Sequence, residues 1–390
     1  MVYTFDMGRL YHILGIGIIG TAAIVMLILI INKKNIYLET YTNFATANLA
    51  DVTVKAKPKN AKILILGDMM FDRTVRSKIN TYGFEYVFGP ATTTFANYDL
   101  VVANLEGPIS THKSKTILDN NKSISGFQFT FATGTARALK NAGIDVVSLA
   151  NNHTDNFGQD GLNQTRQFLD NEGIQYFGSP QNNTAIATST CIAMSATGTS
   201  KDSASKLCIG FIGWHEFGSK NHQNILNEIA ALRPKVDYLI VFPHWGEEYK
   251  KTPHIEQVRL ARVWTDAGAD AVIGAHPHVV QQIVRRTTTD GRVVPIFYSL
   301  GNFIFDQYFS FDTTHGIAVE IEFRATSTAV TESASISSST KSIAQSAMYK
   351  IIPFSSVGTK VSIPNATSTA RIFGDIEKVS GTGVWGWLKK

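Results

Sequence analysis

The sequence predicts a layered α/β domain, because short apolar runs typical of buried strands alternate with stretches of helical periodicity. Six of these runs pass directly into Asp, Glu, Asn or His, and they begin near residues 62, 98, 145, 237, 270 and 295. An open α/β sheet places its ligands at that end of its strands. One such run could arise by chance, but six indicate that the strand ends share a site.

The run at residues 270–280 carries the clearest signal, because it stops at His276, Pro277 and His278. Its small and β-branched residues, bounded by Gly and Pro, fit a parallel strand that is covered on both faces. Proline fixes the backbone between two imidazole rings whose nitrogens can converge on one centre. Packing explains one histidine at a strand end better than it explains two, so we expect a functional site here.

The other five runs supply further candidate ligands. The polar residues at their ends are Asp68, Glu106, Asn151, Asn152, His153, His244 and Asn302. Oxygen and nitrogen donors in this mixture suit divalent ions such as manganese, iron or zinc. A carboxylate can bridge two such ions about 3.5–4 Å apart, so we expect one or two of them. Magnesium bound with substrate phosphates is the alternative, although the histidines argue against magnesium as the sole ion.

Composition limits the number of domains and the classes of binding partner that the chain could have. The chain has 390 residues, of which 44% are hydrophobic and 17% are charged, enough for one large domain or two medium ones. The net charge of +5 is mild, and the basic residues are scattered without interleaved aromatic residues. We therefore expect no nucleic-acid partner. A polyanionic substrate is compatible with this charge but is not shown by it.

The N-terminal part predicts a membrane anchor. Residues 13–31 form an uncharged run, about as long as a helix needs to cross a bilayer, with aromatic residues on either side. A cleaved signal peptide is the rival interpretation, but its apolar core would be shorter, and the nearest small-residue cleavage site lies at 45–47. We expect a flank at 1–12, a single transmembrane helix at 13–31 and a linker at 32–60.

Two features disagree on which side of the membrane the rest of the chain lies. Lys33 and Lys34 follow the predicted helix, which weakly favours a cytoplasmic domain by the positive-inside rule. Cys191 and Cys208 flank a polar Ser/Thr-rich segment typical of a hairpin turn, so their sulfurs would face each other across two strands. A cross-strand disulfide would imply an oxidising compartment, whereas two free buried thiols would not.

The globular part is expected to extend from residue 61 to 380 as one domain without internal repeats. Apolar spacing and glycine stops predict helices at 133–141, 158–171, 225–232 and 260–267. Late strands are predicted at 313–323, 348–353 and 359–363. The Ser/Thr/Ala-rich segment at 325–345 is expected to be a low-complexity loop.

Six segments at these strand ends together resemble the CapA-type capsule-synthesis family. They are 67–73, 104–108, 149–153, 243–246, 274–278 and 299–303, with the sequences GDMMFDR, NLEGP, LANNH, PHWG, GAHPH and SLGNF. Each motif alone is weak, but the set follows the family's order over residues 61–324. The family is named for poly-γ-glutamate biosynthesis and is similar to calcineurin-like metallophosphoesterases. The resemblance therefore implies a four-layer α/β/β/α sandwich. It also implies a globular domain outside the cytoplasm, because family members are commonly tethered outside the cytoplasmic membrane.

The resemblance also implies roles for individual residues. Asp68 matches the aspartate of the first metallophosphoesterase motif, and Glu106 takes the place of the usual bridging aspartate. Asn152 matches a metal-binding asparagine, and the adjacent His153 matches the histidine that lies near the leaving group.

The remaining histidines match further metal ligands of the superfamily. His244 matches a lone histidine, while His276 and His278 match a Gly-His-x-His motif, here with Ala275 before the first histidine. Met70 departs from the pattern, because the superfamily has a histidine ligand there. A thioether is a poor partner for the ions considered.

Because of this departure, we expect two unequal metal positions. The ligands of the complete position would be Glu106, Asn152, His244 and His276. A second position, which would be weaker or empty, would have Asp68, Glu106 and His278. This arrangement argues against a conventional two-metal phosphatase.

Other residues could assist the site. Arg73 lies at its expected mouth, where the guanidinium could hold a carboxylate or phosphate with two hydrogen bonds, or could instead pair with Asp72 or a neighbouring acid. Asn104 and Asn302 could orient the ligands. The adjacent acids at 247–248 could contribute, although acids in such positions are more often solvated.

Two functions fit these residues. In the first, a metal-activated hydroxide attacks a phosphoester or a γ-glutamyl amide during synthesis of a surface polymer, with His153 as the general acid and Arg73 holding the substrate. In the second, the chain is a non-catalytic component of a membrane-bound synthesis or export complex, and the metal site holds an anionic polymer. The presence of His153 favours the first function and Met70 favours the second. We expect the first.

Overall fold

The structure is a computed structural model that describes residues 60–115, 127–182, 187–193, 206–218, 222–324 and 347–390. The predicted anchor at 13–31, the linker before residue 60 and the predicted loop at 325–345 lie outside the described residues. Within the part that is described, no helix has the length and apolar character needed to cross a membrane.

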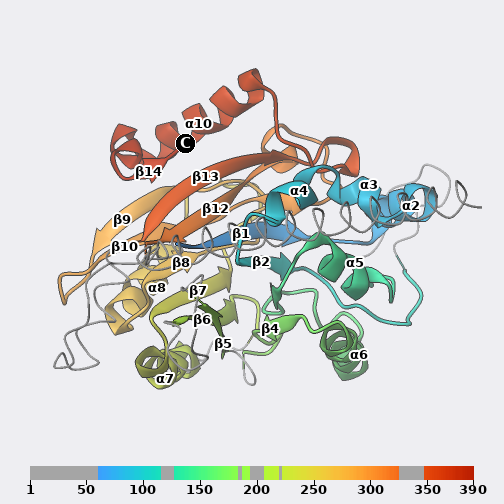
Figure 1. The fold of residues 1–390 in the computed structure, drawn as a ribbon, viewed down its shortest axis with the longest axis horizontal. Helices are drawn as coiled ribbons and strands as arrows, with labels where there is room; N and C mark the ends of the chain where they lie inside the picture. Colours follow the sequence, from blue (N-terminus) through green and yellow to red (C-terminus); the bar gives the residue numbers. More distant parts are fainter. Residues whose placement is uncertain (1–59, 116–126, 183–186, 194–205, 219–221, 325–346) are drawn as a thin grey trace, which may run out of the picture. The chain divides into compact units, whose positions relative to one another are not determined.

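The described strands form two β-sheets (Figure 1). The larger sheet has the order β14-β13-β12-β1-β2-β3-β4, with β11 also pairing with β1. Its strands are β1 (Ala61–Met69), β2 (Leu100–Leu105), β3 (Val146–Ser148), β4 (Gln175–Phe177), β11 (Asn302–Ile304), β12 (His315–Phe323), β13 (Met348–Ser355) and β14 (Leu388–Lys389).

The smaller sheet has the order β5-β6-β7-β8-β10-β9. Its strands are β5 (Ala187–Ala193), β6 (Lys206–His215), β7 (Tyr238–His244), β8 (Ala271–Ile273), β9 (Ile283–Thr287) and β10 (Val293–Phe297). The six apolar runs that predicted a shared site are therefore divided equally between two sheets. β1, β2 and β3 contain the first three runs, and β7, β8 and β10 contain the last three.

Helices pack against both sheets. The described α-helices are α2 (Arg73–Tyr82), α3 (Phe84–Phe88), α4 (Ala91–Phe95), α5 (Thr135–Ala142), α6 (Gly158–Asn171), α7 (His222–Leu232), α8 (Ile255–Ala267) and α10 (Ala366–Ser380). Apolar residues of α2 to α6 share one buried cluster with the larger sheet, and those of α7 and α8 share another with the smaller sheet. α10 instead contributes to the cluster between the sheets.

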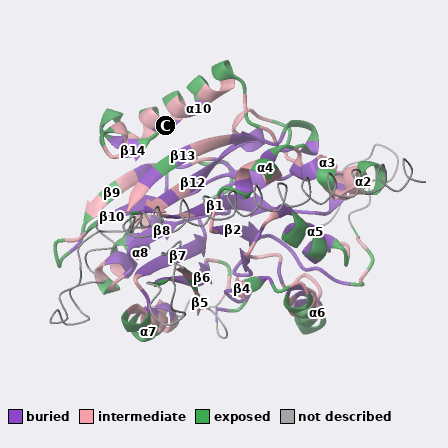
Figure 2. Ribbon diagram, viewed as in Figure 1, coloured by how far each residue is buried: buried purple, intermediate pink, exposed green. Residues whose placement is uncertain are grey.

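The core explains why these strands are apolar on both faces (Figure 2). Along β1, Ile63 and Ile65 belong to the cluster between the sheets, whereas Leu64 and Leu66 belong to the cluster beneath the helices. Successive side chains of a strand point to opposite faces, so both faces of β1 are covered. Helix, sheet, sheet and helix therefore follow one another as four layers.

The predicted helices are confirmed within a few residues as α5, α6, α7 and α8. Gly143 ends α5 with left-handed backbone, φ 91°, as a C-terminal cap. The predicted strand at 359–363 is wrong, because residues 357–359 form a 3₁₀ turn and Gly358 and Thr359 both have positive φ. That backbone is incompatible with an extended strand. Pairing is reduced to one bridge, between Ser355 and Ser362.

Some elements carry no clear sequence signal. α3 and α4 have five residues each, too few to display a helical period. α10 begins at its cap Asn365, whose side chain accepts a hydrogen bond from the Ser368 amide. Beyond residue 380, β14 still pairs with β13, so the larger sheet includes the C-terminal residues that the structure describes.

The two cysteines form a disulfide. β5 and β6 pair antiparallel with Cys191 directly opposite Cys208, and their sulfurs are bonded. The cross-strand interpretation is confirmed, and the alternative of two free thiols is wrong. The bond closes a loop with a sequence separation of 17 and joins an edge strand to the rest of the smaller sheet.

Removal of this disulfide should destabilise the protein. We expect Cys191→Ser together with Cys208→Ser to lower the free energy of unfolding by about 2–4 kcal/mol, because the unfolded chain regains loop entropy. Denaturant unfolding measures the loss. In cells, maleimide labelling of the wild type should require prior reduction, whereas the single variant Cys191→Ser should label without it. Labelling of unreduced wild type, with no loss of stability in the double variant, would contradict this prediction.

Candidate metal centre

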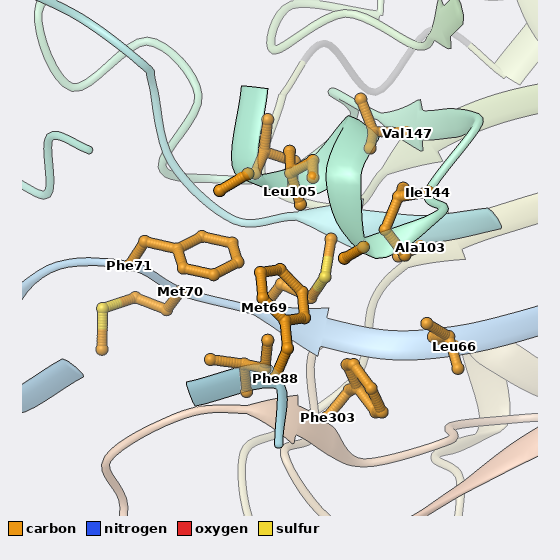
Figure 3. Packing of buried hydrophobic residues seen from close by; sticks show 14 of the residues in the cluster. Leu66, Met69, Met70, Phe71, Phe88, Ala103, Leu105, Ile144, Val147 and Phe303 are labelled. Atoms are coloured by element: carbon orange, nitrogen blue, oxygen red, sulfur yellow. The ribbon is translucent and has the colours of Figure 1, made fainter. Parts of the chain in front are cut away.

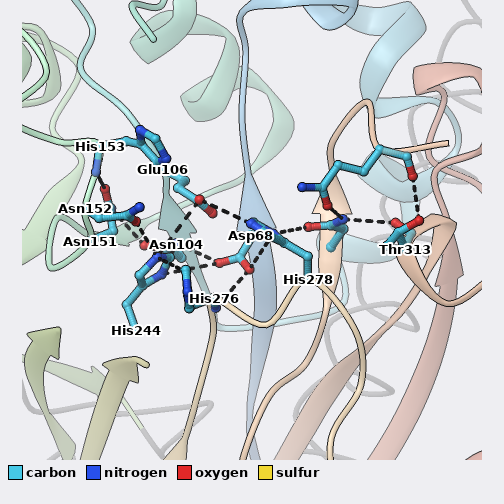
Figure 4. A network of polar contacts seen from close by, with 12 residues as sticks. Asp68, Asn104, Glu106, Asn151, Asn152, His153, His244, His276, His278 and Thr313 are labelled. Carbon is cyan, nitrogen blue, oxygen red and sulfur yellow. Dashed lines mark hydrogen bonds and ion pairs between the residues drawn. The ribbon is translucent and has the colours of Figure 1, made fainter. Parts of the chain in front are cut away.

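The candidate site lies where strand ends of the two sheets meet (Figure 4). In the larger sheet, Asp68 of β1 pairs in register with Asn104 of β2 on one side and with Asn302 of β11 on the other. The register shifts next to Asp68 in both pairings, an irregularity of the kind that re-aims side chains at sheet ends. Three polar residues from distant parts of the chain are thereby placed side by side.

The smaller sheet contributes three histidines. His244 is the last residue of β7, and Ala275 forms a bridge beside it just after β8. His276 and His278 follow in the turn after that bridge. Both sheets thus direct polar residues to the same place from their strand ends.

Two glycines allow the strand ends to approach closely. A Cβ on Gly67 would meet the carbonyl oxygen of Gly301, and a Cβ on Gly274 would meet that of Tyr298. Each glycine lies within two residues of a candidate ligand, so a side chain at either position would displace the site.

Asp68, Glu106 and His244 form one compact group. Each offers a ligand atom, and these atoms all lie within 4.8 Å of one another. The Nδ1 atom of His244 is 3.8 Å from Asp68 Oδ1, and its Nε2 atom is 4.0 Å from Glu106 Oε1. All three side chains are buried.

Asn152 and His276 lie on the same side of His244 as Glu106. The Nε2 atom of His244 is 2.8 Å from Asn152 Oδ1 and 3.1 Å from His276 Nδ1. The structure therefore brings together all four residues expected for the complete metal position.

His278 lies between the two buried carboxylates. Its Nδ1 atom is 3.5 Å from Asp68 Oδ2, and its Nε2 atom is 3.7 Å from Glu106 Oε1. The three residues expected for the second position are thus also close together. His276 and His278 in addition form a group with Glu248, whose ligand atoms lie within the same limit of 4.8 Å.

Backbone strain is concentrated at this site. Of the six described non-glycine residues with positive φ, four are Arg73, Tyr249, His276 and His278. Such backbone costs about 1–3 kcal/mol for each residue and persists where the surrounding structure imposes it, commonly at functional sites. Packing around the site therefore fixes these side chains against their local preference.

The site buries negative charge without a cationic side chain to match it. Asp68 and Glu106 are fully buried, and none of the described Lys or Arg residues forms an ion pair with either. Both carboxylate oxygens of Glu106 lack a hydrogen-bond partner among the described residues. Burial, and then the charge of Asp68, raises the pKa of Glu106 well above its usual range. Buried acceptors without partners, next to imidazole nitrogens, fit a divalent cation.

The histidines are in the state that binds metals. Burial, followed by the neighbouring His276, lowers the pKa of His244 well below its usual value. Burial, followed by His278, does the same for His276. Both imidazoles are therefore neutral at pH 7, and a neutral imidazole is the ligand form.

Three asparagines orient these ligands. The Nδ2 atom of Asn104 donates to Asp68 Oδ1 at 2.7 Å and lies 3.2 Å from His244 Nδ1. Asn151 donates in turn to Asn104 Oδ1 at 3.1 Å. Asn302 Oδ1 lies 2.9 Å from the Nδ1 atom of His278. The contacts match the orienting roles expected for Asn104 and Asn302 and add Asn151, whose signal in the sequence is its position beside Asn152.

His153 is held by residues that the sequence did not single out. Its Nδ1 atom lies 3.2 Å from Asn156 Oδ1, and its ring centre is 4.2 Å from that of Phe129. Burial lowers the pKa of His153 to about 4, against the opposing effect of the Asn156 hydrogen bond. The imidazole is therefore neutral at pH 7, and a general-acid role would require a bound anion to favour its protonated form.

Arg73 is paired with an acid, but not with Asp72. Its Nη2 atom contacts the buried carboxylate of Asp306, and its guanidinium carbon lies 4.9 Å and 5.4 Å from the ring centres of Phe129 and Phe305. Asp72 pairs with Arg76 instead. The Nε atom of Arg73 is buried without a hydrogen-bond partner among the described residues, so the guanidinium retains an unsatisfied donor.

Met70 belongs to the apolar core (Figure 3). It is fully buried in the cluster that includes Phe71 and Phe88, and its sulfur accepts a hydrogen bond from the Asp72 amide at 3.0 Å. The side chain at position 70 thus packs in the apolar core.

Fold and site together define a two-sheet α/β protein with a candidate divalent-metal centre at the strand ends of both sheets. The family model described as "Bacterial capsule synthesis protein PGA_cap" matches residues 62–307. The chain belongs to this family, and the resemblance predicted from the motifs is confirmed.

Two curated relatives carry matching names. The "Capsule biosynthesis protein CapA" of Bacillus anthracis is 32% identical over 278 residues, which cover 68% of this chain and 64% of that protein. The "PGA biosynthesis protein CapA" of Bacillus subtilis (strain 168) is 30% identical over 272 residues, which cover 65% of this chain and 67% of that protein. The chain thus matches slightly less than two thirds of the first relative's length.

A solved structure shows a weaker similarity. It is a Staphylococcus aureus protein assigned as a 5′-nucleotidase, in complex with alpha-ketoglutarate. The TM-score is 0.38 at 10% sequence identity, over 69% of this chain and 51% of that chain. A similarity of this size does not establish a common fold.

Metal content should depend on the clustered histidines. We expect His244→Ala to lower the affinity for Mn²⁺ or Zn²⁺ by at least tenfold, because it removes a ligand atom from the buried group. Metal analysis after equilibrium dialysis measures the loss. The matched control is His112→Ala, because His112 is partly exposed and pairs with Asp160 outside the group. Equal metal content in wild type and His244→Ala would refute the ligand role.

Glu106 should destabilise the metal-free protein as the pH rises. A folded-state pKa above the unfolded value of about 4.3 means that the folded state binds more protons, so stability is present at low pH and declines above that value. In EDTA, Glu106→Gln should therefore gain stability over the wild type as pH rises from 5 to 8, by up to about 1.4 kcal/mol per pH unit. A difference in melting temperature that does not change with pH would contradict the prediction.

Proposed function

We propose that this chain is a membrane-anchored, metal-dependent hydrolase or transferase with a metallophosphoesterase-like fold. It would act on a phosphoester or a γ-glutamyl amide during the synthesis of a capsular polymer of the poly-γ-glutamate type. The observation that carries the proposal is the convergence of Asp68, Glu106, His244, His276 and His278 on one buried place. Family membership supplies the polymer context, because both curated relatives are named for capsule or PGA biosynthesis.

The donor set fits divalent ions, and each group around it would have a separate task. When bound, such ions supply Lewis acidity, which makes a nearby water more acidic and polarises a phosphoryl or carbonyl oxygen. Arg73 would hold the substrate anion through its guanidinium, whose plane is fixed by Asp306 and two aromatic rings. The ion pair with Asp306 neutralises part of the positive charge of Arg73 and holds the guanidinium in one orientation.

His153 would exchange a proton with the substrate. The side-chain amide oxygen of Asn156 can only accept, so the Nδ1 atom of His153 carries the proton in that contact. Proton exchange would then take place at Nε2. A substrate carrying negative charge would raise the pKa of His153 from its low value of about 4 and so favour donation to the leaving group.

A second candidate is a non-catalytic subunit that holds an anionic polymer through the same metal centre. The replacement of a ligand by Met70, which is buried in the core, favours this alternative. The oriented proton-transfer residue His153 favours catalysis, because simple polymer binding would not need it. We therefore place catalysis first.

We further propose that residues 13–31 anchor the chain in the cell membrane and that the globular domain lies outside the cytoplasm. The disulfide between Cys191 and Cys208 supports this orientation, because such bonds persist in oxidising compartments. The labelling experiment on the cysteines tests it in cells. The proposed partners are the anionic polymer or its precursor and a membrane-bound synthesis complex.

Activity assays on the purified full-length protein separate the two candidates. We expect hydrolysis of phosphoesters or γ-glutamyl amides to be lost in Glu106→Ala together with bound metal. His153→Ala should keep its metal but lose about 10²–10⁴-fold in kcat, because only proton transfer is removed. Hydrolysis at the wild-type rate in both variants would end the enzymatic proposal. Polymer binding that depends on metal, without turnover of either substrate class, would establish the non-catalytic subunit instead.

A further inference from the structure

The resemblance implies a histidine ligand at position 70, where this chain has Met70. Glu248, on another loop, lies close enough to His276 and His278 to supply a ligand atom. We propose that Glu248 is a metal ligand that acts with His276 and His278 to complete a second divalent-cation position.

In this assignment His276 serves the second position, and Asp68, Glu106 and His244 hold the first. This inference rests on the proposed function, because it assumes that the centre binds metal. It assigns to this chain a ligand that neither the superfamily pattern nor the predicted ligand set contains.

The geometry of the three residues is that of a ligand set. Ligand atoms of Glu248, His276 and His278 all lie within 4.8 Å of one another. One carboxylate and two imidazoles are the donors that manganese, iron and zinc accept. Both histidines are buried, whereas Glu248 is exposed. Glu248 thus closes the group from its solvent side, where a substrate or water could still reach the ion.

Glu248 is on a loop whose backbone is fixed against the histidine turn. The amide of Tyr249, the next residue, donates to the carbonyl oxygen of Pro277 at 2.8 Å. Pro277 lies between the two histidines of the proposed set. The Nε2 atom of Gln281 donates to the Lys250 carbonyl oxygen at 2.8 Å. The loop and the turn are therefore tied together at the two residues that follow the proposed ligand.

Side chains form a second connection between the loop that carries Glu248 and His278. The Nε2 atom of Gln307 donates to the Tyr249 hydroxyl at 3.0 Å, and its Oε1 atom accepts from Asn302 at 3.0 Å. Asn302 Oδ1 in turn lies 2.9 Å from His278 Nδ1. One polar network thus holds the Tyr249 side chain, next to Glu248, and orients the buried imidazole of His278.

An independent observation points to a cation at this place. Both oxygens of the fully buried Glu106 lack a hydrogen-bond partner, and Oε1 lies 3.7 Å from His278 Nε2. Among the described residues, no Lys or Arg forms an ion pair with Asp68, Glu106 or Glu248. One divalent ion balances the charge of the two buried carboxylates, and Glu248 offers the ligand atom of a third carboxylate beside the same pair of histidines.

Metal stoichiometry of the full-length protein tests the assignment without relying on activity. Wild type and variants are titrated with Mn²⁺ after EDTA treatment, and bound metal is measured by equilibrium dialysis. We expect two equivalents in the wild type, and in Glu248→Gln a loss of at least tenfold in the affinity for one of them. The matched control is Glu247→Gln, because Glu247 is adjacent, exposed and 3.7 Å from Lys250 instead of the histidines. Glu248→His, which restores a ligand atom, should recover the second equivalent.

The outcomes separate this inference from the proposed function. Two equivalents of unchanged affinity in Glu248→Gln would overturn the ligand role of Glu248 and leave the metal centre intact. A single equivalent of equal affinity in both wild type and Glu248→Gln would overturn it as well. No bound metal in the wild type would overturn the proposed function itself. Equal losses in Glu247→Gln and Glu248→Gln would assign the effect to loop charge and so would also reject the inference.

Discussion

The structure depends on how the negative charges of two fully buried carboxylates, Asp68 and Glu106, are offset. Asp68 accepts hydrogen bonds from the Asn104 side chain and the His276 amide, whereas neither oxygen of Glu106 has a partner among the described residues. A buried charge without a partner costs several kcal/mol, which is a large part of the stability of a typical domain. This cost is best explained if a cation offsets it, and the neutral histidines around Glu106 offer further candidate ligand atoms for such an ion.

The two sheets bring the polar residues around these carboxylates together. β1, β2 and β11 place Asp68, Asn104 and Asn302 in register, and β7 and β8 deliver the histidines from the opposite sheet. The apolar cluster between the sheets holds the two sets of strand ends at a fixed separation. His276 and His278 also have positive φ, a strained backbone that persists where the surrounding structure imposes it. Stability elsewhere in the fold therefore supports a site that is locally unfavourable.

Much of the site could be predicted because its residues directly follow apolar runs. Asp68, Glu106, His244 and His276 each come at the end of a strand, and a strand that is buried on both faces is easy to recognise. The disulfide could be predicted for a similar reason, since a hairpin places its two strands opposite each other. The sequence did not reveal that the runs divide between two sheets, because strand pairing is a long-range property. Only the family resemblance indicated it.

Other features could not be predicted, because they depend on contacts far along the chain. Asp306 lies 233 residues from Arg73, and no local pattern marks it as the partner of that guanidinium. Glu248 looks like any exposed acid until the Tyr249 amide is seen to bond to Pro277. The predicted strand at 359–363 failed because positive φ at Gly358 and Thr359 turns the chain. Short helices such as α3 and α4 are too brief to show a period.

Anomalous X-ray diffraction from crystals grown with saturating Mn²⁺ tests the central claim most directly. The account predicts a strong anomalous peak between Glu106 and His244, at about 2.0–2.2 Å from the ligand atoms. The absence of a peak between these two residues, with the Glu106 carboxylate still lacking a cation, would contradict it.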